Sequence, residues 1–161
     1  MPDRAIVNAS PLIFLGNAGF LHFLQVAAGE ILVPSSVVEE LRRGGTREPA
    51  AKAIESCDWL RIVEAPPVPP LVLAWDLGSG ESAVLAYAFA NPDTIAVLDD
   101  LAGRRCAETL GIPVTGTLGL VLIAKRRGMI SAARPVLDVL RDSGMYLSSA
   151  VLDRALALVG E

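Results

Sequence analysis

Short apolar runs alternate with helix-like segments along this chain, and the alternation constrains the fold more than any other feature of the sequence. The runs with strand character lie at residues 5–7, 31–33, 60–63, 95–98 and 113–115. Segments with helical spacing lie between and after them, at residues 11–15, 20–26, 36–43, 49–56, 80–90, 101–110, 117–127, 133–142 and 148–159. Strands that alternate with helices predict a parallel sheet with helical crossovers. We therefore expect an α/β fold with a short central parallel sheet.

The composition fits this expectation. Hydrophobic residues make up 52% of the 161 residues, and the mean hydropathy is +0.48, as expected for strands that are buried on both faces. The length suits one domain over residues 1–161. No apolar run reaches the roughly 18 residues that a membrane-spanning helix needs, and the first residues lack a signal peptide pattern. We expect a cytoplasmic protein without a membrane segment.

Oxygen-bearing side chains follow the predicted strands. Asn8 comes directly after the first strand, and Asp99 and Asp100 follow the strand at 95–98. Glu40 lies on the helix after the second strand, and Glu81 opens the helix at 80–90. In a parallel sheet the ligand crevice lies outside the carboxyl ends of the strands, so these side chains can gather there. Mg²⁺ and Mn²⁺ favour oxygen ligands, and the pattern therefore suggests a hard-cation site.

Each acidic residue also has a purely structural interpretation. An acid at a helix start complements the helix dipole, which would explain Glu81 alone. Glu40 could belong to a solvated helix face, and Asp99 with Asp100 could form a strand-to-helix turn with an N-cap. The joint pattern favours the site, because two adjacent aspartates repel one another and a cation relieves that repulsion.

Several segments together resemble the PIN-domain family. The matching blocks, in chain order, are IVNASPLI (6–13), VPSSVVEEL (33–41), GESA with AYA (80–83 and 86–88), VLDDLAGR (97–104) and GIPVTGTLG (111–119). The resemblance is strongest to a bacterial and archaeal branch with Ser-Pro-Leu in the first motif, Gly-Glu in the third and a double Asp. It extends from about residue 6 to residue 128.

This resemblance implies a Rossmann-like three-layer α/β/α PIN fold and a Mg²⁺- or Mn²⁺-dependent endoribonuclease. It further implies a VapC-like toxin that acts on RNA and is paired with an antitoxin protein. The metal ligands and catalytic groups would be Asn8, Glu40, Glu81 and Asp99 or Asp100. The supporting residues would be Ser10, Thr115 and Thr117.

One position departs from the family pattern. Asn8 stands where most active PIN nucleases carry Asp, and an amide oxygen can ligate a cation but brings no charge. The alternative function is therefore a catalytically weak or inactive PIN-like module that binds RNA or a protein partner. A small-molecule phosphatase on a similar sheet ranks last, because no Asp-x-Asp motif follows the first strand.

Two further features concern partners. Arg104 and Arg105 flank the double Asp and could contact an RNA phosphate, although a solvated helix face explains them equally well. The net charge of −4 argues against a large basic face for a polyanion. The last helices, at 133–159, are the expected contact of a homodimer, since two-fold dimers are the commonest oligomers.

Overall fold

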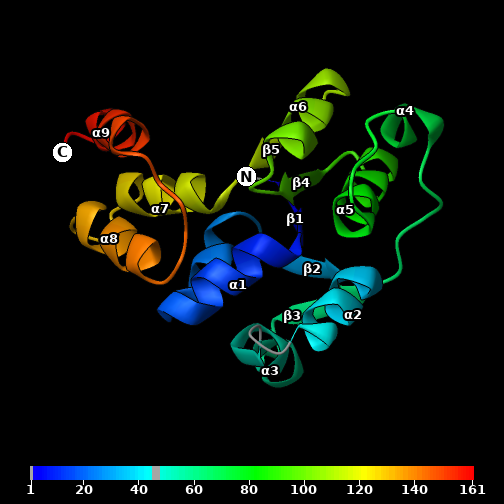
Figure 1. Ribbon diagram of the computed structural model, residues 1–161, viewed down its shortest axis with the longest axis horizontal. Coiled ribbons are helices and arrows are strands. Elements are labelled where there is room, and N and C mark those ends of the chain that lie inside the picture. The colour runs from blue at the N-terminus through cyan, green and yellow to red at the C-terminus, as the bar shows by residue number, and fades with distance from the viewer. Residues whose placement is uncertain (1, 45–47) are drawn as a thin grey trace.

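Five parallel strands form the centre of the protein. They are seen in a computed structural model that describes residues 2–44 and 48–161 (Figure 1). The strands are β1 (Arg4–Val7), β2 (Glu30–Pro34), β3 (Leu60–Val63), β4 (Thr94–Val97) and β5 (Val114–Thr115). Their order in the sheet is β3-β2-β1-β4-β5. The parallel sheet predicted from the sequence is therefore confirmed.

The strand order reverses between β1 and β4. The chain runs outward from β1 to β2 and β3, and then returns to the other side of β1 to form β4 and β5. β1 pairs with β4 in parallel, with Ile6 opposite Ala96 and Val7 opposite Val97. In open α/β sheets such a switch point opens a crevice beyond the carboxyl ends of the two strands. The segments directly after Val7 and Val97 consequently border that crevice.

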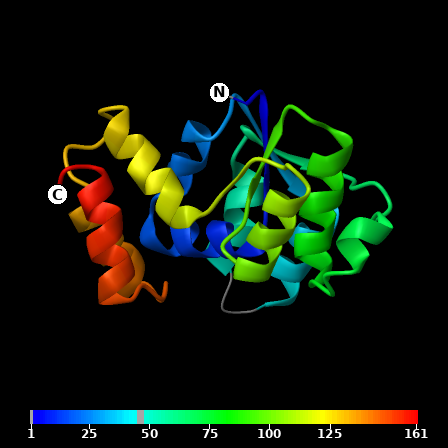
Figure 2. The same cartoon turned by 90° about the horizontal axis from the view of Figure 1, so that it is seen from above.

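Helices cover both faces of the sheet. They are η1, a 3₁₀ helix (Leu21–Val26), and the α-helices α1 (Ala9–Ala18), α2 (Ser35–Arg43), α3 (Glu48–Ser56), α4 (Pro70–Leu73), α5 (Ser79–Ala90), α6 (Leu101–Thr109), α7 (Thr117–Arg126), α8 (Arg134–Asp142) and α9 (Ser149–Leu158). On one side α5 packs against α2, α6 and the central strands. On the other side η1 packs against β2, α1 and α7 (Figures 1 and 2). The result is the three-layer α/β/α arrangement.

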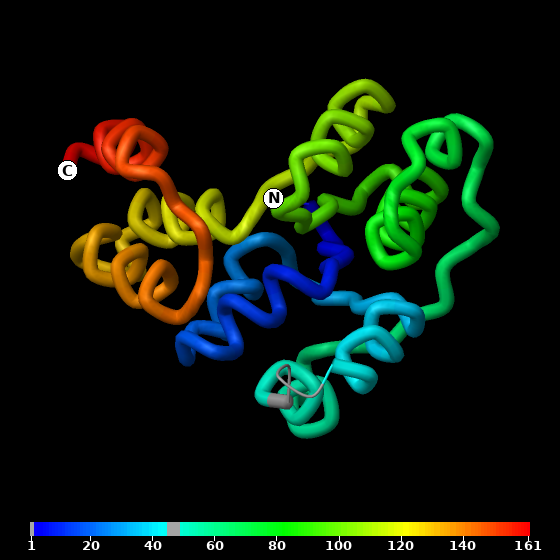
Figure 3. Tube along the Cα trace, in the orientation of Figure 1, coloured from blue at the N-terminus to red at the C-terminus, as the bar shows by residue number. Residues whose placement is uncertain are grey.

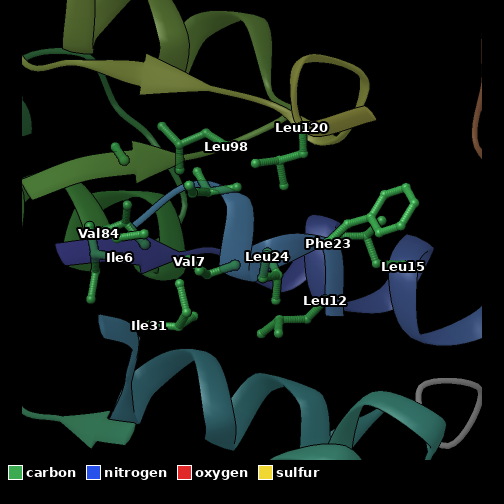
Figure 4. Packing of buried hydrophobic residues seen from close by; sticks show 14 of the residues in the cluster. Ile6, Val7, Leu12, Leu15, Phe23, Leu24, Ile31, Val84, Leu98 and Leu120 are labelled. Atoms are coloured by element: carbon green, nitrogen blue, oxygen red, sulfur yellow. The ribbon is translucent and has the colours of Figure 1, made fainter. Parts of the chain in front are cut away.

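The core lies on both faces of β1. Ile6, Leu24, Leu32 and Leu98 are fully buried, and Figure 4 shows side chains of the sheet meeting those of α1 and η1. Burying a side chain of this size stabilises a protein by about 1.5–3 kcal/mol. The high apolar content of the sequence is thus used to bury both faces of the sheet. None of the described helices is long and apolar enough to cross a membrane.

Helix α1 begins earlier in the chain than an N-cap at Ser10 would place its start. Ser10 is the natural N-cap candidate before Pro11, yet α1 begins at Ala9 and Asn8 occupies the N-cap position. The first turn of a helix tolerates proline, because its amides have no partner within the helix. The side chain of Asn8 makes no capping hydrogen bond, so its amide oxygen remains available at the sheet edge.

The helices α7, α8 and α9 gather at one end of the molecule (Figures 1 and 2). The side chain of Glu161 joins the end of α9 to the start of α8. Its carboxylate accepts the backbone N–H of Ala133 at 2.6 Å and that of Arg134 at 3.2 Å. The hydrogen bond from Ala133 is the main cause that lowers the pKa of the Glu161 carboxyl below its ordinary value. The ionised side chain therefore supplies the cap that the free amides of α8 need.

A substitution of Glu161 tests the contribution of these two hydrogen bonds to stability. Because the folded-state pKa is lowered, the stabilisation is present above the ordinary pKa of 4.5 and is lost as the pH falls through the lowered value. Glu161→Ala is expected to melt at a lower temperature than wild type at neutral pH, and the two melting curves should converge in acid. Calorimetric melting across this pH range measures the difference. A constant gap at all pH values would contradict the assignment.

Candidate metal and active site

The switch point brings Asn8 beside the end of β4. The backbone N–H of Asn8 donates to the carbonyl oxygen of Val97 at 3.1 Å, so the residue after β1 lies next to the segment that carries Asp99 and Asp100. The sequence separates these groups by about ninety residues, and the pairing of β1 with β4 brings them to the same edge of the sheet. The backbone pairing of β1 with β4 therefore explains how these oxygen-bearing groups come to the same edge.

Asn8 and Glu40 meet across Gly80. A Cβ at Gly80 would lie 2.9 Å from the Oδ1 of Asn8 and 2.9 Å from the Oε2 of Glu40. Gly80 is therefore a position where the absence of a side chain leaves room between two oxygens. Asn8 is 3% exposed, and its Oδ1 has no hydrogen-bond partner among the described residues. A buried acceptor without a partner costs free energy, which a cation bound in this cradle would recover.

Asp99 is tied to the start of α7. Its Oδ1 accepts the backbone N–H of Thr117 at 2.7 Å, and its Oδ2 accepts the hydroxyl of Thr117 at 2.8 Å. Burial raises the pKa of the Asp99 carboxyl, while the hydrogen bonds from Thr117 and the nearby positive charge of Arg104 act in the opposite direction. Asp99 is thus a half-buried carboxylate held in one orientation at the sheet edge.

Asp100 caps α6, the helix that directly follows it in the chain. Its Oδ2 accepts the backbone N–H of Gly103 at 2.8 Å, which satisfies an amide in the first turn of α6. The side chain is exposed and lines a cavity at the sheet edge. The capping interpretation and the site interpretation therefore both describe Asp100, because one carboxylate oxygen caps while the residue also faces the cavity.

Glu81 enters the site from α5. Its Cγ lies 3.8 Å from the position of a Cβ at Gly103, and the Oδ2 of Asp100 lies 3.5 Å from the same point. Glu81 and Asp100 thus both lie close to Gly103. On its other side the carboxylate of Glu81 folds back against Gly78, which has no side chain to obstruct it.

A cavity of about 440 Å³ opens in front of these groups. Its polar side is made of residues from the sheet edge and the helix starts, namely Ser10, Glu81, Asp99, Asp100 and Arg104. The rest of its lining is made of apolar and aromatic residues from α1, α7 and the connection between α8 and α9, namely Phe14, Leu118, Met145, Tyr146 and Leu147. Nothing in the sequence pattern singles out this second set, because its members are far apart and belong to no motif.

The sequence-derived residues thus fall into two neighbouring sets. Glu81, Asp99, Asp100 and Ser10 line the cavity, whereas Asn8 and Glu40 meet at Gly80, the neighbour of Glu81 in the chain. Glu39 is exposed, whereas Glu40 is half-buried.

The supporting and basic residues divide as well. Thr117 is buried and holds Asp99, whereas the buried Thr115 hydroxyl lies 3.5 Å from the carbonyl oxygen of Gly116 and is absent from the described lining. The Nη1 of Arg104 lies 3.2 Å from the position of a Cβ at Gly116, close to Asp99. Arg105 is exposed on α6 outside the described cavity lining.

Within residues 2–44 and 48–161, no three His, Cys, Asp or Glu side chains are arranged to hold a metal ion. The oxygens at Gly80 nevertheless fit a hard cation. Mg²⁺ is usually held by one or two carboxylates and keeps several waters, so a complete cage of side chains is unnecessary. The unpartnered Oδ1 of Asn8 and the space that a Cβ would fill are the two observations that support this fit.

A comparison with known proteins identifies the family of this chain. A family model described as a PIN domain matches residues 4–161, nearly the whole chain. A comparison with curated proteins found no match. The chain belongs to the PIN-domain family, whose members are generally nucleases and typically use divalent metals. The match includes α8 and α9, so these helices are part of the family region, beyond the limit at residue 128 that the motifs alone indicated.

Gly80→Ala tests the cradle directly. The added methyl group would occupy the space between Asn8 and Glu40. We therefore expect the variant to bind Mn²⁺ at least about 10-fold more weakly than wild type, as measured by calorimetry. The fold should persist, because alanine suits a helix better than glycine.

Gly16→Ala is the matched control for this substitution. It adds the same group to helix α1, where the nearest atoms lie at an ordinary 3.6 Å. Unchanged Mn²⁺ binding in Gly80→Ala, or equal weakening in both variants, would rule out a cation in the cradle.

Proposed function

We propose that the protein is a Mg²⁺- or Mn²⁺-dependent endoribonuclease of the PIN type. The observation that carries the proposal is the pair of oxygens from Asn8 and Glu40 that face the side-chain-free space at Gly80, beside a cavity lined by Glu81, Asp99 and Asp100. Membership of a family of nucleases supports the chemistry. The oxygen-only donor set supports the choice of metal.

The proposal assigns the residues of the site different roles in RNA cleavage. Asn8, Glu40, Glu81 and Asp99 or Asp100 would hold the metal, which would supply Lewis-acid chemistry for phosphodiester hydrolysis by activating a water and stabilising the leaving oxygen. Arg104, as the cation that lines the polar side of the cavity, binds the phosphate. Thr117 fixes the orientation of Asp99 through two hydrogen bonds. A carboxylate of the cavity accepts the proton of the attacking water.

The biological setting belongs to the same proposal. A cytoplasmic RNA-cleaving toxin restrained by an antitoxin protein would suit a chain of this family and size. The helices α8 and α9 are the proposed homodimer contact. An apolar groove between α7 and α9 supports this surface, because Leu122, Val151 and Leu158 line it and Leu158 is 64% exposed.

Cleavage of single-stranded RNA in Mn²⁺ tests the nuclease. Glu40→Gln and Asp100→Asn are each expected to abolish cutting, because each removes a charged ligand while an amide remains in the same position. Asn still serves as a helix N-cap, so the second change should preserve α6. The measurement is gel analysis of RNA fragments with and without EDTA.

Glu39→Gln is the matched control, since it makes the same change on the exposed neighbouring residue. It should cut RNA like wild type. Cutting that survives both site substitutions, or that persists in EDTA, would refute the proposal.

The buried amide of Asn8 favours a second candidate, a catalytically weak or inactive PIN module that binds RNA or a protein partner. An uncharged oxygen attracts a cation less strongly than a carboxylate does. Asn8→Asp separates the two candidates. For the nuclease we expect measurable Mn²⁺ binding by wild type and a modest gain in the variant. Wild type without Mn²⁺ binding in calorimetry, together with cutting that appears only in the variant, would identify the module.

A further inference from the structure

The cavity has an apolar wall that the hydrolytic chemistry does not use. Phe14 from α1 and Leu118 from α7 form part of it, and Met145, Tyr146 and Leu147 form the rest. The last three belong to the connection between α8 and α9, which runs along the side of the C-terminal helices that faces the rest of the molecule (Figures 2 and 3). Glu81, Asp100 and Arg104 line the same cavity.

Tyr146 is the exposed member of this wall. Its side chain is 87% exposed, the largest value among the exposed large hydrophobic residues of the described chain. Met145, its neighbour, is 8% exposed, and Leu147 packs against the core. Two inward-facing neighbours therefore leave Tyr146 as the exposed residue of this connection at the lining of the cavity.

The backbone around Tyr146 is held on both sides. The N–H of Met145 donates to the carbonyl oxygen of Leu140 at 3.1 Å, and Gly144 adopts a φ of 113° that few other residues accept. After Tyr146, the Oγ of Ser148 accepts the N–H of Val151 at 3.2 Å and caps α9. An aromatic ring on an anchored connection is a suitable platform for a flat ligand.

We propose that this wall is a nucleobase subsite, in which the ring of Tyr146 stacks on an unpaired base of the RNA. The inference rests on the proposed function and names the substrate feature that the site selects. The arrangement of charges supports it, because Arg104 offers a cation for the phosphate in the cavity where the ring offers a face for the base. The volume of about 440 Å³ falls within the roughly 300–1,000 Å³ of small-ligand pockets.

The proposal selects single-stranded RNA for a physical reason. Bases within a helix already stack on their neighbours, so only an unpaired base can offer its face to a side chain. The occupant is therefore an unstacked base next to the phosphodiester at the acidic edge. An apolar side chain of a protein partner would use the same wall through contact area alone and would need no flat ring.

The experiment compares two oligomers of equal length by fluorescence anisotropy. One is an unstructured RNA, and in the other, tetrahydrofuran spacers replace the bases while the phosphates remain. Ca²⁺ replaces Mn²⁺ to neutralise the acidic edge, and a gel confirms that the RNA stays intact. Wild type is expected to bind the RNA about 5- to 100-fold more tightly than the spacer oligomer. Tyr146→Ala should lose most of this preference and leave binding of the spacer oligomer unchanged.

Three variants sharpen the result. Tyr146→Phe keeps an aromatic face and should retain the preference, whereas Tyr146→Leu keeps the apolar contact but should lose it. Phe89→Ala removes an aromatic side chain that is 43% exposed on α5, outside the described lining of this cavity, and should behave like wild type. The high exposure of Tyr146 predicts unchanged melting temperatures for its variants, which calorimetry checks.

The outcomes separate this inference from the nuclease proposal. A wild-type protein that prefers the RNA through Tyr146 but cuts nothing in Mn²⁺ would leave the subsite standing and remove the nuclease. Cutting with equal affinity for both oligomers, or with a preference that survives Tyr146→Ala, would overturn the subsite alone. Retention of the preference in Tyr146→Leu would also overturn it, as would a wild type that binds neither oligomer.

Discussion

The pairing of β1 with β4 is the constraint on which the rest of the structure depends. It fixes Asn8 next to the segment of Asp99 and Asp100, because Val7 lies opposite Val97 at the last step of the pair. It also forces the chain to cross back over the sheet between β3 and β4, and α5 is the longer of the two helices in that crossing. The start of α5 therefore arrives at the same edge and supplies Gly80 and Glu81. The gathering of these residues at one edge of the sheet is a consequence of strand order.

The acidic edge is tolerable because helices begin there. Asp100 caps α6, Asp99 bonds the first residue of α7, and Glu81 lies in the first turn of α5. Amides at helix starts carry partial positive charge, which offsets part of the repulsion among these carboxylates. The positions of these acids at helix starts thus help to make it possible for their charges to lie close together. The amide of Asn8 lowers the repulsion further, since it adds an oxygen without adding a charge.

The sequence predicted the parallel sheet and most helices, because those features follow from periodicity within one segment. It could not predict the apolar wall of the cavity. Tyr146 lines the same cavity as the acidic edge through the packing of α7, α8 and α9, and no local pattern encodes that packing. The role of Gly80 was equally hidden, because it consists of a missing side chain between two distant residues.

The two sides of the cavity come from separate stretches of chain. Its polar side lies within residues 10–104, whereas most of its apolar side lies within 118–147 and ends at the connection between α8 and α9. Glu161 ties the end of α9 to the start of α8, so this connection is part of a closed module. Lengthening or shortening that connection could alter which ligands fit while the carboxylates stay in place. Such a division would let related proteins diverge in selectivity without rebuilding their reactive centre.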